Sequence, residues 1–426
     1  MSTAPANSSA DLIHGGTTDT KYQTPQRRLM EQAFNRALQA GKRLVVRIEA
    51  PWSDECVTYE ESLPQHGARL NELLSKVESL VLNEADFDRA HGVDYLPSEM
   101  LHFQTVYFCD PATRTWAIVP HVTSAQLFTQ YLTLWLERPQ FPQTLQQLAL
   151  EATTPETAVG IPFKHLVETA IQTAGYSLSF EETRALVEKL REKKAKQPDL
   201  FQGIDLDALY MRGSQNQISA GRITYEELSA KDPQLGKRMF DSLENMIEAR
   251  LYNVIGVLLR KQGLEAAARQ VPALLETVHK DMAAKGLTHE GEVADTGIVR
   301  AKNEAAFKVL EARAGLITRE QAVKFNEQLI AQNVPFYFRE SVPHIFVALG
   351  DYATAASLIE ATLPEWGMFY DGLIAHMRSQ TKSKDSKDEK MVQMFGNKLA
   401  IFEKLKVRVI NARRARAESL RKLASS

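Results

Sequence analysis

Ten histidines and two cysteines are the residues of this 426-residue chain that are best suited to bind a transition metal. No histidine stands in an HExxH or HxH pattern, and none forms a spaced Cys–His set. A zinc site would therefore have to assemble from residues that lie far apart in the sequence. Nucleotide-binding and nucleophile motifs are also missing, since GxxxxGK[ST], GxGxxG and GxSxG do not occur. Function has to be sought in partial signals.

Adjacent carboxylates are plentiful but do not suggest an acid–base pair. Glu60 and Glu61 follow each other directly, as do Glu181 and Glu182. Neighbouring side chains on a helix point about 100° apart, so they do not face one site. We interpret them as solvated groups near the positive ends of helices.

The last part of the chain combines strong positive charge with an apolar stripe. Between Lys398 and Lys422 there are nine basic and two acidic residues, a net charge of +7. This pattern predicts a basic amphipathic helix over residues 391–426. Its stripe could pack on the chain's own body or dock on a partner protein or a second copy, and its arginines could contact nucleic acid or an anionic membrane surface. The residues expected to bind the partner are Phe395, Leu399, Phe402, Arg413, Arg414, Arg416 and Arg421.

A second signal lies in residues 12–51, LIHGGTTDTKYQTPQRRLMEQAFNRALQAGKRLVVRIEAP. This segment resembles the opening of the TraB/Tiki group of metal-dependent hydrolases, in which a strand ends in a Gly-x-x-His turn, and a helix and a strand with an acidic residue follow. The resemblance implies a divalent metal bound by His14, with Asp19 or Glu49 as the supporting carboxylate. The chain departs from the group's pattern because it lacks the glycine before His14.

A third signal is a helical hairpin near residue 350. The stretch GDYATAASLIEATLP, after PHIFVAL, resembles the second helix of a tetratricopeptide repeat. The resemblance implies that Gly350 makes the turn between two helices, that Ala355 and Ala361 allow close packing, and that Pro364 ends the unit. No second copy is clear at the 34-residue period. An ordinary αα-hairpin in a helical domain is the alternative.

The N-terminal region mixes helix and strand periods. Spacings of three and four predict helices over 25–40 and 69–82, and the run LVVRI predicts a strand over 44–48. Two β-rich runs, 103–109 and 115–119, are separated by DPATR, whose Asp110 and Pro111 favour a turn. We therefore expect a β-hairpin there.

The rest of the chain is predicted to be helical. Prolines mark a linker before position 163, and a charged stretch without apolar residues marks another before 391. Ser179 with Glu182 and Thr318 with Gln321 form capping-box patterns at two helix starts. The expected organisation is a disordered tail (1–20), a small α/β region (21–140), a linker (141–162), a helical domain (163–378), a charged linker (379–390) and the basic helix (391–426).

Composition and charge bound the class of protein. The chain is 44% hydrophobic and 24% charged with a net charge of −2, which excludes a generally basic nucleic-acid coat and an acidic disordered chain. No apolar run is long enough for a membrane-spanning helix, and residues 1–10 do not resemble a signal peptide. We expect a cytoplasmic protein, or one exported without a Sec signal peptide. Cys56 and Cys109 are expected to be buried free thiols.

These observations predict a mainly α protein with a small N-terminal α/β or α+β region and a helical-hairpin C-terminal domain. The function expected is that of a non-enzymatic helical scaffold or protein-interaction protein, such as a bacterial effector or an assembly component. The alternative is a TraB/Tiki-like metal-dependent hydrolase that uses His14.

Overall fold

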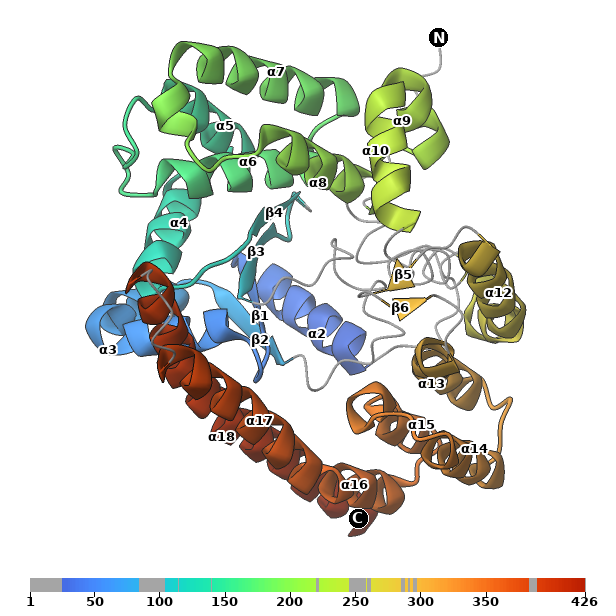
Figure 1. Cartoon of the computed structure of the whole chain (residues 1–426). Helices are drawn as coiled ribbons and strands as arrows, with labels where there is room; N and C mark the ends of the chain where they lie inside the picture. Colours follow the sequence, from blue (N-terminus) through green and yellow to red (C-terminus); the bar gives the residue numbers. More distant parts are fainter. Residues whose placement is uncertain are drawn as a thin grey trace. The chain divides into compact units, whose positions relative to one another are not determined.

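The computed structural model (Figure 1) describes residues 25–83, 104–113, 115–138, 140–219, 222–244, 258, 262–284, 288–289, 292–293, 297–382 and 389–425. The chain is mainly helical with a small N-terminal sheet, which confirms the predicted fold class. It divides into two compact units. Unit 1 comprises Met1–Glu49, Tyr59–Leu82 and His91–Lys261, and unit 2 comprises Ala50–Thr58, Asn83–Ala90 and Gln262–Ser426.

The sheet of unit 1 has four strands in the order β2-β1-β3-β4. The strands are β1 (Leu44–Glu49), β2 (Glu78–Asn83), β3 (Thr105–Asp110) and β4 (Thr115–Val119). The β1–β3 and β3–β4 pairs are antiparallel, so the predicted hairpin is confirmed. Its turn is stabilised by the Asp110 carboxylate, whose Oδ1 accepts a hydrogen bond from the Ala112 amide at 3.0 Å.

The helix predicted over residues 69–82 is only partly present. Along the chain, helix α2 (Pro25–Gln39) precedes strand β1 and helix α3 (Asp54–Leu74) follows it. The following residues, from Glu78 on, form strand β2 beside β1 instead of continuing the helix. A short apolar run such as Leu80 to Leu82 fits either period, and the open edge of β1 decides for the strand.

Seven α-helices and a short 3-10 helix complete the described part of unit 1. They are α4 (Ala125–Glu137), α5 (Phe141–Glu151), α6 (Phe163–Ser177), α7 (Phe180–Lys196), η3 (Pro198–Phe201), α8 (Leu206–Ser219), α9 (Tyr225–Lys231) and α10 (Pro233–Glu244). One hydrophobic core runs from the sheet residue Val45 to Met239 of α10. The α/β region and these helices therefore share a core.

The segment 141–162, which was expected to be a linker, is partly helical in the structure. Helix α5 occupies the first half of this segment, and its Phe141 and Leu145 are buried in the core of unit 1. Pro142 lies in the first turn of α5, where a proline lacks no needed hydrogen bond. Pro142, one of the prolines that suggested a linker, thus marks the start of a helix. The division between the two units lies near Gln262 instead.

Helices α6 and α8 cross with their backbones in close approach. A Cβ atom placed on Gly175 of α6 would lie 2.3 Å from the carbonyl oxygen of Gly213 in α8. No side chain fits at that distance, so the crossing requires glycine at position 175. Because the two backbones approach so closely, α6 and α8 lie in the same layer of the core.

Unit 2 is built from helices over most of its described length. These are α12 (Leu264–Ala284), α13 (Gly297–Arg313), α14 (Arg319–Ala331), η4 (Phe336–Arg339), α15 (Val342–Ala348), α16 (Tyr352–Ala361), α17 (Leu363–Lys382) and α18 (Glu389–Ser425), with the short strands β5 (Thr288–His289) and β6 (Glu292–Val293). Helices α13 to α16 enclose a core that α18 completes with Ala417 and Leu420. Within the described residues, no helix has the length and apolar character needed to cross a membrane.

The helical hairpin predicted near residue 350 is present as α15 and α16. Gly350 adopts a left-handed backbone with φ +76° in the turn between them, and Ala355 is buried in the core of unit 2. Pro364 does not end the helical region, because it lies in the first turn of α17. Helix α17 continues to Lys382, so residues 379–382 of the expected charged linker are helical, while residues 383–388 lie outside the described residues.

Sequence signals at helix starts and at the cysteines are also borne out. Both capping boxes form, at Ser179 with Glu182 and at Thr318 with Gln321. Cys56 and Cys109 are buried thiols that are not joined in a disulfide. Local patterns thus predicted these features correctly.

Candidate binding pocket

Helix α18 is covered by the chain's own helices along its apolar stripe. It lies beside α17 and α16 (Figure 1), and its side chains Leu405, Val409, Ala417 and Leu420 are buried there. Leu399 and Phe402, two of the predicted partner-binding residues, are half-buried, and Phe402 packs against the Leu405 cluster. Phe395 lies in α18 outside the described side chains.

The predicted arginines of α18 have different surroundings. Arg413 forms an ion pair with Glu340, which precedes α15, and Arg421 forms one with Glu360 of α16. Arg416 Nη2 lies 3.5 Å from the Nδ1 atom of His344. Arg414 is exposed and lies 3.3 Å from the side-chain oxygen of Asn411. Only two of the four, Arg413 and Arg416, line a pocket.

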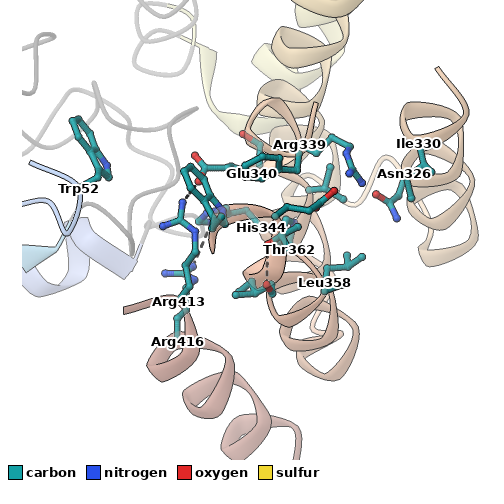
Figure 2. Close-up of a pocket in the computed structure, with 18 of the residues that line it drawn as sticks. Trp52, Asn326, Ile330, Arg339, Glu340, His344, Leu358, Thr362, Arg413 and Arg416 are labelled. Atoms are coloured by element: carbon teal, nitrogen blue, oxygen red, sulfur yellow. Dashed lines mark hydrogen bonds and ion pairs between the residues drawn. The ribbon is translucent and has the colours of Figure 1, made fainter. Parts of the chain in front are cut away.

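This pocket has a volume of about 330 Å³ and is lined by residues of unit 2. Its described walls come from α14, η4, α15, α16, α17 and α18, and Trp52 of the Ala50–Thr58 segment also lines it. Figure 2 shows Arg413 and Arg416 on one side and Asn326, Ile330 and Leu358 on the other. The pocket therefore has two chemically different walls.

We call Arg413, Arg416 and His344 the basic wall. Arg413 is only 16% exposed, and its guanidinium carbon lies 4.0 Å from the centroid of the Trp366 ring. Together with the ion pair to Glu340, this stacking holds the Arg413 side chain in one position. Arg416 follows three residues later on the same helix, so the two guanidinium groups lie on the same face of α18.

We call Ile330 and Leu358 the apolar wall. Ile330 belongs to α14 and is 50% exposed although it is aliphatic, and Leu358 of α16 is half-buried. Asn326, one turn before Ile330, places an amide beside them. Exposed aliphatic surface in a concave site is typical of ligand pockets.

The turn after α14 leads into η4, which lines the pocket with Phe336 and Arg339. Asn333 adopts a left-handed backbone with φ +55°, which turns the chain into η4. Arg339, at the end of η4, donates from Nε to the carbonyl oxygen of Val334 at 3.0 Å, which orients its guanidinium group. Phe336 anchors η4 on α17, because its ring packs edge-on against Trp366 with the centroids 4.9 Å apart.

The residues of the hydrolase alternative are not brought together by the described structure. His14 and Asp19 lie outside the described residues. Glu49 ends strand β1, and its Oε1 lies 2.6 Å from Nη2 of Arg47 in an ion pair. Among the residues that the structure describes, no group of three His, Cys, Asp or Glu side chains is placed to hold a metal ion. The alternative stays a prediction.

Unit 1 contains a buried polar cluster between α4 and α6. The Tyr131 hydroxyl lies 2.8 Å from His165 Nδ1 and donates to the Thr169 hydroxyl at 3.0 Å. His165 Nε2 lies 3.2 Å from the carbonyl oxygen of His121. Burial lowers the pKa of His165, although Glu168 acts in the opposite direction. These bonds hold α4 against α6, and a neutral imidazole suits that role.

Most of the pocket was not predicted from the sequence. Ile330, Arg339 and His344 come from three separate elements, and no spacing in the sequence links them. Arg413 and Arg416 were predicted as binding residues because the basic cluster of α18 is visible in the sequence. A signal for Ile330 exists only in retrospect, as an aliphatic residue on the polar side of α14.

Comparison with known proteins gives no match for this chain. No family model, no curated protein and no solved structure matches it. The two resemblances noted above rest on their own residues, and the pocket of unit 2 is the site on which a functional proposal has to be built.

Proposed function

We propose that this chain is a non-enzymatic interaction protein that binds a polypeptide partner through unit 2. The observation that carries the proposal is the pocket between the basic wall and the apolar wall. It combines half-exposed Ile330 with two arginines of α18 in a concave volume of about 330 Å³. Such a combination of apolar surface and a few oriented polar groups favours recognition of a ligand.

The ionisable groups of the pocket favour binding over catalysis. Three of the six ionisable residues of the lining are arginines, Arg339, Arg413 and Arg416, and a guanidinium group does not exchange its proton near neutral pH. The others are Glu340, Glu365 and His344, and His344 lies 3.5 Å from Arg416 Nη2. Glu340 is engaged by Arg413. Guanidinium groups of this kind recognise carboxylates and similar anions through paired hydrogen bonds. The pocket therefore has the composition of a recognition site.

The test begins with a photo-crosslinking amino acid at Tyr337, an exposed residue of η4 that does not line the pocket. Captured proteins are identified by mass spectrometry and then produced in purified form. Calorimetry measures their affinity for the wild-type chain, for Ile330→Asp and for Val407→Asp. Val407 is the matched control, because it is an exposed aliphatic residue of unit 2 outside the pocket.

The proposal expects Ile330→Asp to weaken binding of the purified partner at least about tenfold, since a charge replaces buried apolar contact. Val407→Asp is expected to leave the affinity unchanged. If no captured protein binds in purified form, or if both variants bind like the wild type, the proposal is wrong.

A further inference from the structure

We infer that the pocket of unit 2 binds an acidic peptide segment, with a carboxylate on the basic wall and an apolar side chain on the apolar wall. The inference rests on the proposed function and names the chemistry of the ligand. It follows from the charge of the pocket, the rigidity of its basic wall, the exposed apolar surface of its opposite wall and its volume.

The charge of the pocket favours an anion. Three arginines line it against two acidic residues, Glu340 and Glu365. Because Arg413 and Glu340 are paired with each other, Arg339 and Arg416 remain against Glu365. Arg416 lies 3.5 Å from His344, so two basic side chains stand together on one side. A carboxylate placed there would gain charge-assisted hydrogen bonds, which are stronger than neutral ones.

The basic wall is rigid before any ligand arrives. Arg413 is held by the Glu340 carboxylate on one side and by the face of Trp366 on the other. Trp366 is itself packed against Phe336, so the stack continues into η4. A side chain that is already ordered loses little conformational entropy on binding. The wall therefore favours a ligand whose charge is at a fixed place.

The opposite wall requires an apolar group on the same ligand. Ile330 is half-exposed, and Leu358 lies on the same side of the pocket (Figure 2). Covering these side chains removes apolar surface from water, which is favourable. Asn326 adds an amide that could bond a peptide backbone group. A peptide with an acidic residue next to an apolar residue can contact the basic wall with its carboxylate and the apolar wall with its apolar side chain.

The size and the lining of the pocket argue against a nucleic acid. Its volume of about 330 Å³ lies at the small end of the range for ligand pockets, roughly 300 to 1,000 Å³, and fits one or two side chains. A phosphate backbone needs a series of lysine and arginine contacts. The described lining contains three arginines and no lysine, gathered around one small pocket, so it does not provide such a series.

The probe is a fluorescein-labelled peptide of about twelve residues that combines glutamate and leucine, a length that can place both residue types in one groove. Fluorescence anisotropy measures its binding to the full chain. A second peptide carries glutamine in place of every glutamate, and a third carries serine in place of every leucine. A single-stranded oligonucleotide of about twenty nucleotides tests the nucleic-acid alternative.

Pairs of matched variants test whether the peptide binds in the pocket. Arg416→Gln removes a guanidinium group from the basic wall, and Arg414→Gln removes one from an exposed position two residues away. Ile330→Ser and Val407→Ser form the corresponding aliphatic pair. Circular dichroism checks that each variant is folded. Arg339→Gln replaces Arg416→Gln if the latter does not fold, since Arg339 also lines the pocket.

We expect the glutamate–leucine peptide to bind at least about tenfold more tightly than either control peptide and than the oligonucleotide. Arg416→Gln and Ile330→Ser are expected to weaken this binding about tenfold, while Arg414→Gln and Val407→Ser stay within about twofold of the wild type. The inference is overturned if the glutamine peptide binds as tightly, if the oligonucleotide binds more tightly, or if the matched variants behave alike.

The failure of this inference is distinguishable from failure of the proposed function. The separating result is a purified partner that loses affinity for Ile330→Asp but is unaffected when the acidic residues of its bound segment are changed to amides. In that case the ligand chemistry is wrong and the proposed function stands. If no purified partner depends on Ile330, the proposed function fails first.

Discussion

Arg413 of α18 lies over the ring of Trp366 in α17, with its guanidinium carbon 4.0 Å from the ring centroid. The same guanidinium group forms an ion pair with Glu340. One side chain of the C-terminal helix thus joins α17 to the segment that leads into α15. The relationship makes Arg413 part of the structure of unit 2 as well as of the pocket.

The first prediction concerns the stability that this contact provides. Arg413→Leu should lower the free energy of unfolding by about 2 to 4 kcal/mol, because it removes the cation–π contact with Trp366 and the partly buried ion pair with Glu340. Arg413→Lys keeps the charge but not the planar stacking, so its loss should be smaller. Denaturant unfolding followed by circular dichroism measures both variants. Equal stability of Arg413→Leu and the wild type would contradict the prediction.

The second prediction compares two valines of α18. Val409 is fully buried against α17, whereas Val407 is 59% exposed. Val409→Ala should lower the free energy of unfolding by about 2 kcal/mol, since buried methyl groups are lost. Val407→Ala should change it by less than about 0.5 kcal/mol, because alanine suits an exposed helix position. The difference would vanish if α18 did not pack on its own chain.

The third prediction concerns the crossing of α6 and α8. Gly175→Ala should destabilise the chain by about 1 to 3 kcal/mol, because its Cβ would lie 2.3 Å from the Gly213 carbonyl oxygen. Gly372 of α17 is the control, since a Cβ there meets no atom within 4 Å. Gly372→Ala should stabilise the chain by up to about 1 kcal/mol through helix propensity. Thermal unfolding that ranks the two variants in the opposite order would refute the close crossing.

The fourth prediction concerns pH. Burial lowers the pKa of His165 in the folded chain, while in the unfolded chain the imidazole titrates near its ordinary value of about 6.5. The stability that His165 provides is therefore complete above about pH 6.5, and it decreases as the pH falls towards the folded pKa, with a slope of up to about 1.4 kcal/mol per unit.

The check is the free energy of unfolding from about pH 8 to about pH 5 for the wild type and for His165→Gln. Glu168 and His121, the charged and titratable neighbours of His165, are present in both proteins, so the difference between the two curves reports His165. The wild type should lose its advantage over the variant as the pH falls. A constant difference between the two curves would mean that His165 takes up its proton equally in both states.

The fifth prediction addresses the hydrolase alternative. As an interaction protein, the chain should carry less than about one equivalent of any divalent metal after purification, and His14→Ala should not change that content. Elemental analysis by plasma mass spectrometry measures both proteins. Stoichiometric metal in the wild type, lost in His14→Ala, would support the hydrolase alternative instead.

The elements that the sequence predicted well are those with strong local signals. The capping boxes at Ser179 and Thr318, the turn at Asp110 and the glycine turn at Gly350 depend on residues within a few positions of each other. Local hydrogen bonds and backbone preferences decide such features. The strand over 78–83 was missed because its identity depends on β1, which lies in a separate segment of the chain, on the far side of helix α3.

By itself the sequence determined the fold class, the helical hairpin and the basic amphipathic character of the last helix, because periodicity and charge are local properties of the chain. Only the tertiary structure decided that α18 buries its stripe on α16 and α17, and that α5 joins one core instead of separating two domains. It also brought Arg416 and Ile330 to opposite sides of one pocket. Packing between distant segments selects these contacts, since each side chain is buried only where another element supplies a complementary surface.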